Sequence, residues 1–407
     1  MANPIDILRE RGFLKQVVFE DDLYKLFDDE RVTFYVGIDP TADSMHIGHT
    51  VPLMAMAHLQ RCGHRPIALM GGGTAMIGDP SGKSDMRTML TREELDHNVK
   101  GIAGQVGRYI DLSGDALVLN NADWLFGLNY MEFIRDIGVH FSVNRMLTAE
   151  CYKQRLEKGL TFLEFNYMLL QSFDFLHLFQ NFDCKLQIGG DDQWSNILAG
   201  ADLIRRKERK DAFAMTYSLL LNSEGVKMGK TVGGALWLDK DKCSPYDFYQ
   251  YLRNVADADV KTCLSLLTFL PMDEVNRLAA LKDSAINEAK VILATEVTTL
   301  VHGAEAALEA KRAAEALFSG GGLDGAIPTT VIGSEQLREN PRLVDLMALV
   351  GLAKSKGDAR RLIQGGGVSV NGKTIESPDA EVSTEDFTAE GMMVRKGKKT
   401  YHNIVLK

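Results

Sequence analysis

The first half of the chain alternates short apolar runs with longer stretches of helical period, and this alternation constrains the fold more than any other feature. The runs typical of strands are Val32–Ile38, Pro66–Met70, Ala116–Asn120, Lys185–Ile188 and Met215–Leu221. The stretches with a helical pattern are His49–Arg61, Arg92–Leu112, Met131–Gly138, Tyr167–Phe179 and Gln193–Arg206. This order predicts an α/β fold, in which a parallel sheet carries helices on both faces. Such sheets bind ligands beyond the carboxyl ends of their strands, where the strand order reverses.

The second half of the chain has a different pattern. Residues 244–318 lack strand alternation and predict several helices, and the glycines at 320–322 open an irregular stretch typical of a linker. In the tail that follows, the pair Asn371-Gly372 is a strong turn signal for a β-hairpin. We therefore expect four parts: an α/β domain over 1–240, an α-helical domain over 241–320, a linker over 321–340 and a small α+β domain over 341–407.

Composition and charge narrow the environment of the protein. Five scattered cysteines without a C-x-x-C pair favour free thiols in a reducing compartment and argue against zinc or another bound metal. The first residues lack the apolar core of a targeting peptide, and no stretch approaches the ~18 apolar residues of a membrane span. We expect a cytoplasmic protein with no membrane partner. The net charge is −9, yet residues 341–407 carry 11 basic and 8 acidic side chains, which suits local binding of a polyanion.

A run that directly follows the first predicted strand, D-P-T-A-D-S-M-H-I-G-H, places His46 and His49 three residues apart. Pro52 is tolerated only in roughly the first turn of a helix, so the helix begins near Gly48 and both histidines lie at its N-terminus. Backbone N–H groups and the helix dipole favour a bound phosphate there, and Gly48 leaves room for a nucleotide ring. The alternative is a metal pair or an accidental surface pair, although no further ligands follow a metal-binding pattern.

A second motif, K-M-G-K-T, follows the last predicted strand and contains Lys227, Lys230 and Thr231. Two lysines three residues apart, with a glycine between them, suit a short mobile loop that stabilises a leaving pyrophosphate. Taken alone, such a run is more often a solvated basic turn. It is not a P-loop, because Glu224 stands where that motif needs a glycine.

Together, and in this order, the two motifs resemble the HIGH and KMSKS signatures of class I aminoacyl-tRNA synthetases. Three further runs, at 71–87, 162–175 and 186–196, narrow the resemblance to the bacterial tyrosyl-tRNA synthetases. They are GGGTAMIGDPSGKSDMR, FLEFNYMLLQSFDF and LQIGGDDQWSN. The tail from about Val344 to Tyr401 is similar to the S4 RNA-binding domain of these enzymes. The resemblance implies a Rossmann-like catalytic domain with a dimerisation segment inserted at about 118–183, an α-helical anticodon-binding domain and an S4-like domain.

This resemblance implies a two-step reaction. L-Tyrosine reacts with ATP, accompanied by Mg²⁺, to give tyrosyl-adenylate and pyrophosphate, and tyrosine then passes to the 3′ end of tRNA(Tyr). By this resemblance, Tyr35 and Asp174 match the family positions that bind the phenol group of the substrate. A Tyr35 hydroxyl can donate while an ionised Asp174 accepts, so phenylalanine would leave two buried polar groups unpaired. The resemblance also implies that the enzyme is a homodimer.

The remaining site residues are assigned by the same resemblance. Asp79, Tyr167 and Gln171 match positions that hold the substrate ammonium group, and Gln187 completes the predicted tyrosine pocket. Positions around the nucleotide are matched by Gly37, Asp39, Thr41, Gly48, Gly190, Asp192, Gln193 and Lys230. The residues that the resemblance assigns to stabilising charge on the phosphates are His46, His49, Lys227, Lys230, Thr231, Lys83 and Arg87. Two positions depart from the family pattern: Asp191 adds a carboxylate that could alter magnesium or ribose contacts or face solvent, and Val36 removes a weak contact near the ribose.

Contacts with RNA are predicted less specifically. The candidates are the basic residues Arg205, Arg206 and Lys207 after a helix, with Arg360, Arg361, Lys396, Lys398 and Lys399 in the tail. Asn121 and Trp124 are placed near the acceptor stem as well. As a charge run, residues 205–210 would more often be only solvated surface. Such contacts mainly bind phosphate and position the RNA.

Three other functions compete with this interpretation. A tryptophanyl enzyme would share the fold, but Tyr35 and Asp174 suit a phenol better than an indole. A relative that only binds structured RNA would be expected to have lost the histidine or lysine pairs, and all four residues are present. A nucleotidyltransferase with H-x-x-H would share the first motif but neither the phenol pocket nor the tail.

Overall fold

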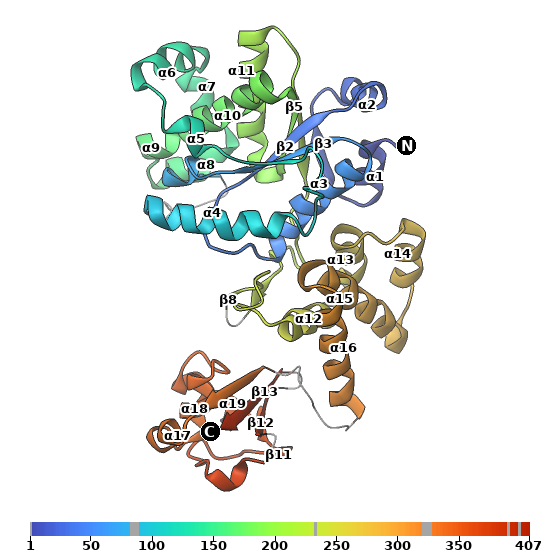
Figure 1. The fold of residues 1–407 in the computed structure, drawn as a ribbon, viewed down its shortest axis with the longest axis vertical. Helices are drawn as coiled ribbons and strands as arrows, with labels where there is room; N and C mark the ends of the chain where they lie inside the picture. The colour runs from blue at the N-terminus through green and yellow to red at the C-terminus, as the bar shows by residue number, and fades with distance from the viewer. Residues whose placement is uncertain (1, 82–88, 232–233, 320–327, 389–390, 398–399) are drawn as a thin grey trace. The chain divides into compact units, whose positions relative to one another are not determined.

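The computed structural model describes residues 2–81, 89–231, 234–319, 328–388, 391–397 and 400–407 (Figure 1). The chain forms two compact units. The first unit comprises Met1–Gly229, Trp237–Asp239 and Val255–Ala289, and the second unit comprises Lys230–Leu236, Lys240–Asn254 and Lys290–Lys407. No helix among the described residues combines the length and apolar character that a membrane span requires.

The first unit is built on a six-stranded sheet with the order β1-β6-β5-β2-β3-β4. Its strands are β1 (Leu14–Val17), β2 (Thr33–Ile38), β3 (Arg65–Met70), β4 (Leu117–Asn120), β5 (Cys184–Gly190) and β6 (Phe213–Tyr217). Neighbouring strands are parallel except for β1, which pairs antiparallel with β6. The predicted α/β fold with a parallel sheet is therefore confirmed.

The edge of the sheet differs from the prediction in two details. The antiparallel strand β1 is not among the predicted strands, because four residues with a mixed pattern give little periodic signal. The last predicted strand ends at Tyr217 instead of Leu221. Beyond it, the Ser218 N–H donates to the carbonyl of Phe13, and Leu221 pairs with Lys227 in a separate hairpin.

The first unit contains helices on both faces of this sheet and, in α13 (Val260–Leu267) and α14 (Met272–Ala279), helices that pack beyond them. The other helices are α1 (Pro4–Glu10), α2 (Glu20–Asp29), α3 (Thr50–Arg61), α4 (Arg92–Val106), α5 (Ala122–Leu125), α6 (Tyr130–Asp136), α7 (Val143–Leu147), α8 (Glu150–Lys158), α9 (Phe162–Phe165), α10 (Tyr167–Phe182) and α11 (Trp194–Glu208). The connections β2–α3–β3 and β5–α11–β6 step in opposite directions along the sheet. Right-handed crossovers therefore place α3 and α11 on opposite faces, and the strand order reverses between β2 and β5.

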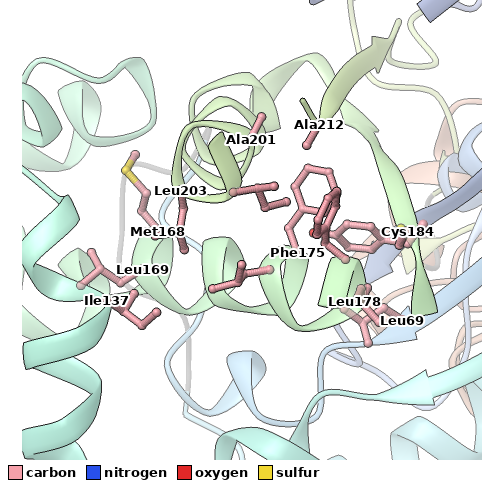
Figure 2. Close-up of a cluster of buried hydrophobic side chains, with 14 of the residues drawn as sticks. Leu69, Ile137, Met168, Leu169, Phe175, Leu178, Cys184, Ala201, Leu203 and Ala212 are labelled. Atoms are coloured by element: carbon pink, nitrogen blue, oxygen red, sulfur yellow. The ribbon is translucent and has the colours of Figure 1, made fainter. Parts of the chain in front are cut away.

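A buried apolar cluster fills the space between α10, α11 and the sheet (Figure 2). Phe175 and Leu178 of α10 are fully buried, and they pack with Leu69 of β3 and Leu203 of α11. Tyr35 belongs to this cluster, with its ring centroid 5.4 Å from that of Phe175. One face of α10 is thus fixed against the sheet by apolar packing, which also sets the direction of its polar residues.

A buried ion pair organises the segment before α10. The side chains of Arg155 in α8 and Glu164 in α9 are only 6 % and 3 % exposed. The Arg155 guanidinium donates to both carboxylate oxygens, at 2.8 and 3.1 Å, and to the carbonyl of Gly159. The Thr161 hydroxyl caps α9 by accepting from the Glu164 N–H. Since α10 begins two residues after α9 ends, the pair fixes the entry to α10.

The second unit contains helices and a separate mixed sheet. Its helices are α12 (Pro245–Arg253), most of α15 (Ile286–His302), α16 (Ala304–Ser319), α17 (Ser334–Glu339), α18 (Leu343–Leu349) and α19 (Lys356–Gln364). Its strands are β7 (Lys230–Thr231), β8 (Gly234–Ala235), β9 (Thr329–Ile332), β10 (Val368–Val370), β11 (Lys373–Thr374), β12 (Met392–Lys396) and β13 (Thr400–Leu406). The last five form one sheet in the order β11-β10-β12-β13-β9, over a core of its own.

Three details of the second unit bear on the predicted organisation. The hairpin at Asn371-Gly372 is confirmed: β10 and β11 are antiparallel, and both turn residues have positive φ, at 49° and 82°. Residues 329–339 of the predicted linker fold as β9 and α17. Residues 255–289 of the predicted helical domain cluster with the first unit.

We predict that Arg155→Ala destabilises the first unit by about 3–5 kcal/mol, because it leaves the Glu164 carboxylate buried without its partner. All three tryptophans lie in the first unit, so their fluorescence in urea follows the unfolding of that unit. The matched control is Arg277→Ala, which breaks exposed pairs with Glu274 and Glu288 and should cost far less stability. Equal losses in the two variants would contradict the structural role of the buried pair.

Candidate active site

A cavity of about 350 Å³ opens in the first unit, beyond the carboxyl ends of β2 and β5. This is the point at which the strand order reverses, where an open parallel sheet is expected to bind its ligand. Among its walls are the predicted residues Tyr35, Gly37, Asp39, Thr41, His46, His49, Asp79, Tyr167, Gln171, Asp174, Gln187, Gly190, Asp192, Gln193 and Lys227. Residues that are distant in sequence therefore meet in one cavity.

The deep end of the cavity holds a buried carboxylate. Asp174 of α10 is 2 % exposed, and its two oxygens accept hydrogen bonds from Asn121 Nδ2 at 2.8 Å and from Trp124 Nε1 at 2.7 Å. Burial raises the pKa of Asp174 to about 7, although these two hydrogen bonds act in the opposite direction. The carboxylate is thus held ready to change its protonation state near neutral pH.

Three polar atoms in the cavity wall have no hydrogen-bond partner among the described residues. They are the Tyr35 hydroxyl and the Oε1 atoms of Gln171 and Gln187. Burial and the charge of Asp174 raise the pKa of Tyr35 well above its ordinary value, so its hydroxyl keeps its hydrogen. A buried polar atom left unpaired is costly, so these atoms indicate where a polar ligand completes the structure.

A second group of carboxylates lies along the same cavity. The Tyr167 hydroxyl donates to Asp39 Oδ2 at 3.0 Å, and Gln193 Nε2 donates to Asp79 Oδ2 at 2.6 Å. Asp79 is 6 % exposed and also accepts the backbone N–H of Ser81. With Asp174, these groups give this part of the cavity an excess of negative charge, which favours a cationic ligand group.

The two histidines form a compact pair at the start of α3. Their ring centroids are 4.1 Å apart, and the His46 N–H donates to His49 Nδ1 while the Gly48 N–H donates to His46 Nδ1. Because both Nδ1 atoms accept hydrogen bonds, each ring carries a hydrogen on Nε2. Burial lowers the pKa of His49 to about 3, so this imidazole stays neutral. The Nε2–H groups of both rings can therefore donate to an anion.

Gly48 lies between the two histidines. It is not in the cavity wall, and a Cβ at this position would come within 2.9 Å of the His46 ring. The glycine therefore leaves room for the imidazole pair. Lys227 lines the cavity, whereas Lys230 and Thr231 form β7 of the second unit. Lys83 and Arg87 lie outside the described residues.

The two residues predicted to lie near the acceptor stem are hydrogen-bonded to Asp174, and Asn121 lines the cavity. Asn121 is 1 % exposed, follows β4 directly and donates to both Asp174 and Thr74. Trp124 lies one turn further on, and its indole stacks on His177 with the centroids 4.3 Å apart. At 1 % exposure Asn121 is not available to RNA, so its predicted placement is wrong, whereas the RNA contact of the partly buried Trp124 stays a prediction. Their position just beyond a predicted strand was the signal that could have placed them in the site.

The two departures from the family pattern have simple structural explanations. Asp191 does not line the cavity; its Oδ1 accepts hydrogen bonds from Gln16 of β1 at 2.6 Å and from Thr216 of β6 at 3.2 Å. Its carboxylate thus ties the edge strands to the loop that carries Asp192. Val36 is 1 % exposed and is not part of the cavity wall, since strand residues alternate between faces.

Several of the residues predicted to bind RNA are engaged in protein contacts. Arg205 pairs with Asp202, Arg206 donates to the carbonyl of His140, and Lys207 donates to that of Asp136. In the tail, Arg360 pairs with Asp379, Arg361 pairs with Asp358, and Lys396 donates to the carbonyl of Leu352. Lys398 and Lys399 lie outside the described residues. These contacts fix the directions of the side chains, and most of the pairs lie at the surface.

Comparisons with known proteins agree with this geometry. Residues 28–319 match the family model "tRNA synthetases class I (W and Y)", and residues 324–404 match "Tyrosine--tRNA ligase SYY-like C-terminal domain". The chain is 58 % identical to a tyrosine--tRNA ligase of Clostridium beijerinckii, over 100 % of both chains. It is 59 % identical to one of Clostridium botulinum, over 99 % of both.

Solved structures are similar to the chain as well. A C-terminally truncated mitochondrial tyrosyl-tRNA synthetase of Aspergillus nidulans superposes with a TM-score of 0.70 at 29 % identity, over 78 % of this chain and 95 % of that one. A tryptophanyl-tRNA synthetase of Encephalitozoon cuniculi gives a TM-score of 0.58 at 14 % identity, over 75 % of this chain and 87 % of that one. At that identity the second similarity concerns the fold alone.

We predict that the affinity for L-tyrosine falls as the pH falls from about 8 to about 6. A phenol that donates to Asp174 stabilises the ionised carboxylate and lowers its pKa, so below about pH 7 binding must release a proton. The ammonium and carboxylate groups of tyrosine do not titrate in this range. Calorimetry in two buffers of different ionisation enthalpy measures both the affinity and the proton release.

A matched variant tests the cause of this pH dependence. Trp124→Phe removes one donor to Asp174, which raises the carboxyl pKa further and should move the midpoint of the transition to higher pH. A tyrosine affinity that stays constant across this range would contradict the assignment of the phenol to Asp174.

Proposed function

The chain belongs to the class I tRNA synthetases of the tryptophan and tyrosine group and ligates tyrosine to tRNA, and we propose that the cavity of the first unit is where L-tyrosine reacts with ATP. The observation that carries this proposal is the pairing of complementary groups at its deep end. The Tyr35 hydroxyl has a hydrogen to donate and no partner, and Asp174 has a carboxylate that can accept. A single phenolic O–H satisfies both groups.

This arrangement explains the selection of tyrosine over its closest competitors. Phenylalanine would fill the space but leave the buried Tyr35 hydroxyl without an acceptor and Asp174 without the expected donor, which costs binding free energy. Tryptophan offers an N–H donor but no oxygen to accept from Tyr35. The same two side chains therefore act against both of the other large aromatic amino acids.

The polar groups further along the cavity suit the backbone end of the amino acid. Asp79, Tyr167 and Gln171 hold the ammonium group in this proposal, since a carboxylate and acceptor oxygens surround its position. Gln187 Oε1 is a further unpaired acceptor beside them. Gly37, Asp39, Thr41, Gly190, Asp192 and Gln193 take the nucleotide and the adenylate.

The chemistry of the first step is positioning and charge stabilisation. The substrate carboxylate attacks the α-phosphorus of ATP, the bond to the bridging oxygen breaks, and pyrophosphate leaves with its electrons. The nucleophile is already an anion, so no side chain has to remove a proton. The Nε2–H groups of His46 and His49 donate to the charge that develops on the phosphoryl group, and Lys227 stabilises the pyrophosphate. Lys83, Arg87, Lys230 and Thr231 are assigned the same task by resemblance.

Magnesium accompanies ATP in this proposal. No group of three or more histidine, cysteine, aspartate or glutamate side chains suited to a metal is found in the part of the chain that the structure describes. Mg²⁺ keeps several waters and is held mainly by the substrate phosphates with one or two protein carboxylates, so it needs no such cluster. Asp39 and Asp192 in the cavity wall are the carboxylates within reach of the nucleotide. When bound, Mg²⁺ would neutralise part of the negative charge on the phosphates.

The second step requires tRNA(Tyr), whose terminal ribose takes the tyrosyl group from the adenylate. We assign acceptor-stem contacts to Arg205, Arg206 and Lys207, and further contacts to Arg360, Arg361, Lys396, Lys398 and Lys399. The helices of 241–320 bind near the anticodon, and the C-terminal sheet acts as the S4-like module, in a cytoplasmic enzyme. These assignments rest on the family and on the positive charge of residues 341–407.

A second copy of the chain is the proposed partner of one exposed apolar surface. Among the described residues, ten of the nineteen exposed large apolar side chains lie between positions 126 and 163, on and between α5 and α9. They are Phe126, Tyr130, Met131, Ile134, Val139, Val143, Leu147, Leu156, Phe162 and Leu163. A surface this apolar is typical of an obligate interface, and it lies within the predicted dimerisation segment.

The cavity assignment is tested by pyrophosphate exchange into ATP. We expect exchange that depends on L-tyrosine and is absent with L-tryptophan, L-phenylalanine or no amino acid. His49→Ala should lower the single-turnover rate of adenylate formation by about 100-fold or more, because it removes a donor to the developing charge. Its tyrosine affinity should change little. A large loss of tyrosine binding with a normal rate of activation would contradict the role given to His49.

The dimer is tested by a charge placed on the apolar surface. Phe162 is 67 % exposed at the start of α9, and Phe162→Glu should give a monomer at micromolar concentration because the carboxylate cannot be buried unpaired. Analytical ultracentrifugation measures the mass. Leu308→Glu, on the exposed surface of α16, is the matched control and should leave the mass unchanged. A wild-type protein that sediments as a monomer would contradict this proposal.

A further inference from the structure

Lys227 is carried by a short hairpin over residues 220–228, which we call the lysine hairpin. The Met228 N–H donates to the carbonyl of Leu220, and the Asn222 N–H donates to that of Val226, both at 2.9 Å. The Asn222 side-chain oxygen accepts two further N–H groups in the turn. The lysine hairpin is thus closed by its own hydrogen bonds, which fix Lys227 relative to the rest of the hairpin.

The lysine hairpin is attached to helix α13 at two points. The backbone N–H of Ser223, in the turn, donates to Asp259 Oδ1 at 2.7 Å. At the base of the hairpin, the sulfur of Met228 lies 3.8 Å from that of Cys263. Asp259 immediately precedes α13, and Cys263 lies about one helical turn further on. One short stretch of the helix therefore contacts both ends of the lysine hairpin.

The two partners in this contact differ in how firmly they are held. Cys263, Leu264 and Leu267 of α13 are fully buried, and the Arg11 guanidinium donates to the carbonyls of Ser265 and Thr268 at the end of the helix, both at 3.0 Å. By contrast, residues 223–227 of the hairpin are exposed. The helix is therefore a rigid support, and the hairpin depends on it for its position.

Asp259 is the strongest of these attachments. The residue is only 6 % exposed, so its carboxylate is largely shielded from water and depends on protein donors such as the Ser223 N–H. Hydrogen bonds to an ionised group are stronger than neutral ones. A sulfur–sulfur contact adds packing but little direction. The contact of Asp259 with Ser223 thus sets where the turn lies, and through the hairpin where Lys227 lies.

We propose that Asp259 is a positioning residue for tyrosine activation, which fixes the lysine hairpin on α13 so that the Lys227 ammonium reaches the leaving pyrophosphate. The inference rests on the function proposed above for Lys227. It assigns no contact between Asp259 and substrate. Since the catalytic value of a point charge depends steeply on its position, the loss of Asp259 acts on the activation step through Lys227.

The test measures single-turnover adenylate formation and tyrosine affinity in Asp259→Ala and Asp259→Asn. We expect the rate to fall by about tenfold or more in Asp259→Ala, and by less in Asp259→Asn, whose amide oxygen still accepts a weaker hydrogen bond. The tyrosine affinity and the tryptophan-fluorescence unfolding curve should stay close to wild type. Asp273→Asn removes a carboxylate at the start of the next helix and is the matched control, with an unchanged rate.

A double variant separates positioning from a general structural effect. If Asp259 acts through Lys227, Asp259→Ala causes no further loss of rate in a Lys227→Ala background. Losses that multiply, or an unchanged rate in Asp259→Ala alone, would overturn the inference while leaving the role of Lys227 intact. An unchanged rate in Lys227→Ala would instead remove the proposed function of Lys227, and this inference with it.

Discussion

Much of this site depends on keeping one carboxylate buried and still able to ionise. Asp174 reaches the cavity because apolar residues on its own helix, Phe175 and Leu178, pack α10 against the sheet. Burial alone would hold the acid neutral, and the donors Asn121 and Trp124 bring its pKa back to about 7. The proposed selectivity for a phenol thus rests on a balance between a desolvation cost and two hydrogen bonds.

The cavity separates its charges along its length. Asp79 and Asp174 lie at the proposed amino-acid end, where an ammonium group is to be bound, while His46 and His49 lie at a helix N-terminus, where we propose that the nucleotide binds. Because the imidazole of His49 is neutral, it donates without adding a fixed positive charge beside these carboxylates. The positive charge is supplied by Lys227, whose hairpin packs on helix α13. Ground-state binding and stabilisation of the leaving group are therefore carried by separate parts of the structure.

The sequence predicted the central strands within a few residues, because each is a short apolar run bounded by turn residues. It failed for β1, whose partner β6 is about 200 residues away, and for the hydrogen bonds that join Asn121 and Trp124 to Asp174. The role of Asp191 was equally hidden, since Gln16 and Thr216 come from two different strands. In each case the deciding contact joins residues far apart in the chain, so no local pattern records it.

By itself, the sequence determined the α/β class, the positions of both motifs and the residue types available for a phenol, an ammonium group and a phosphate. These follow from periodicity and from chemistry carried by single side chains. Only the tertiary structure decided that Asp174 titrates near neutrality, that His49 is neutral and that Asp259 holds the lysine hairpin. The physical reason is that desolvation and long-range hydrogen bonds exist only once the chain has brought these groups together.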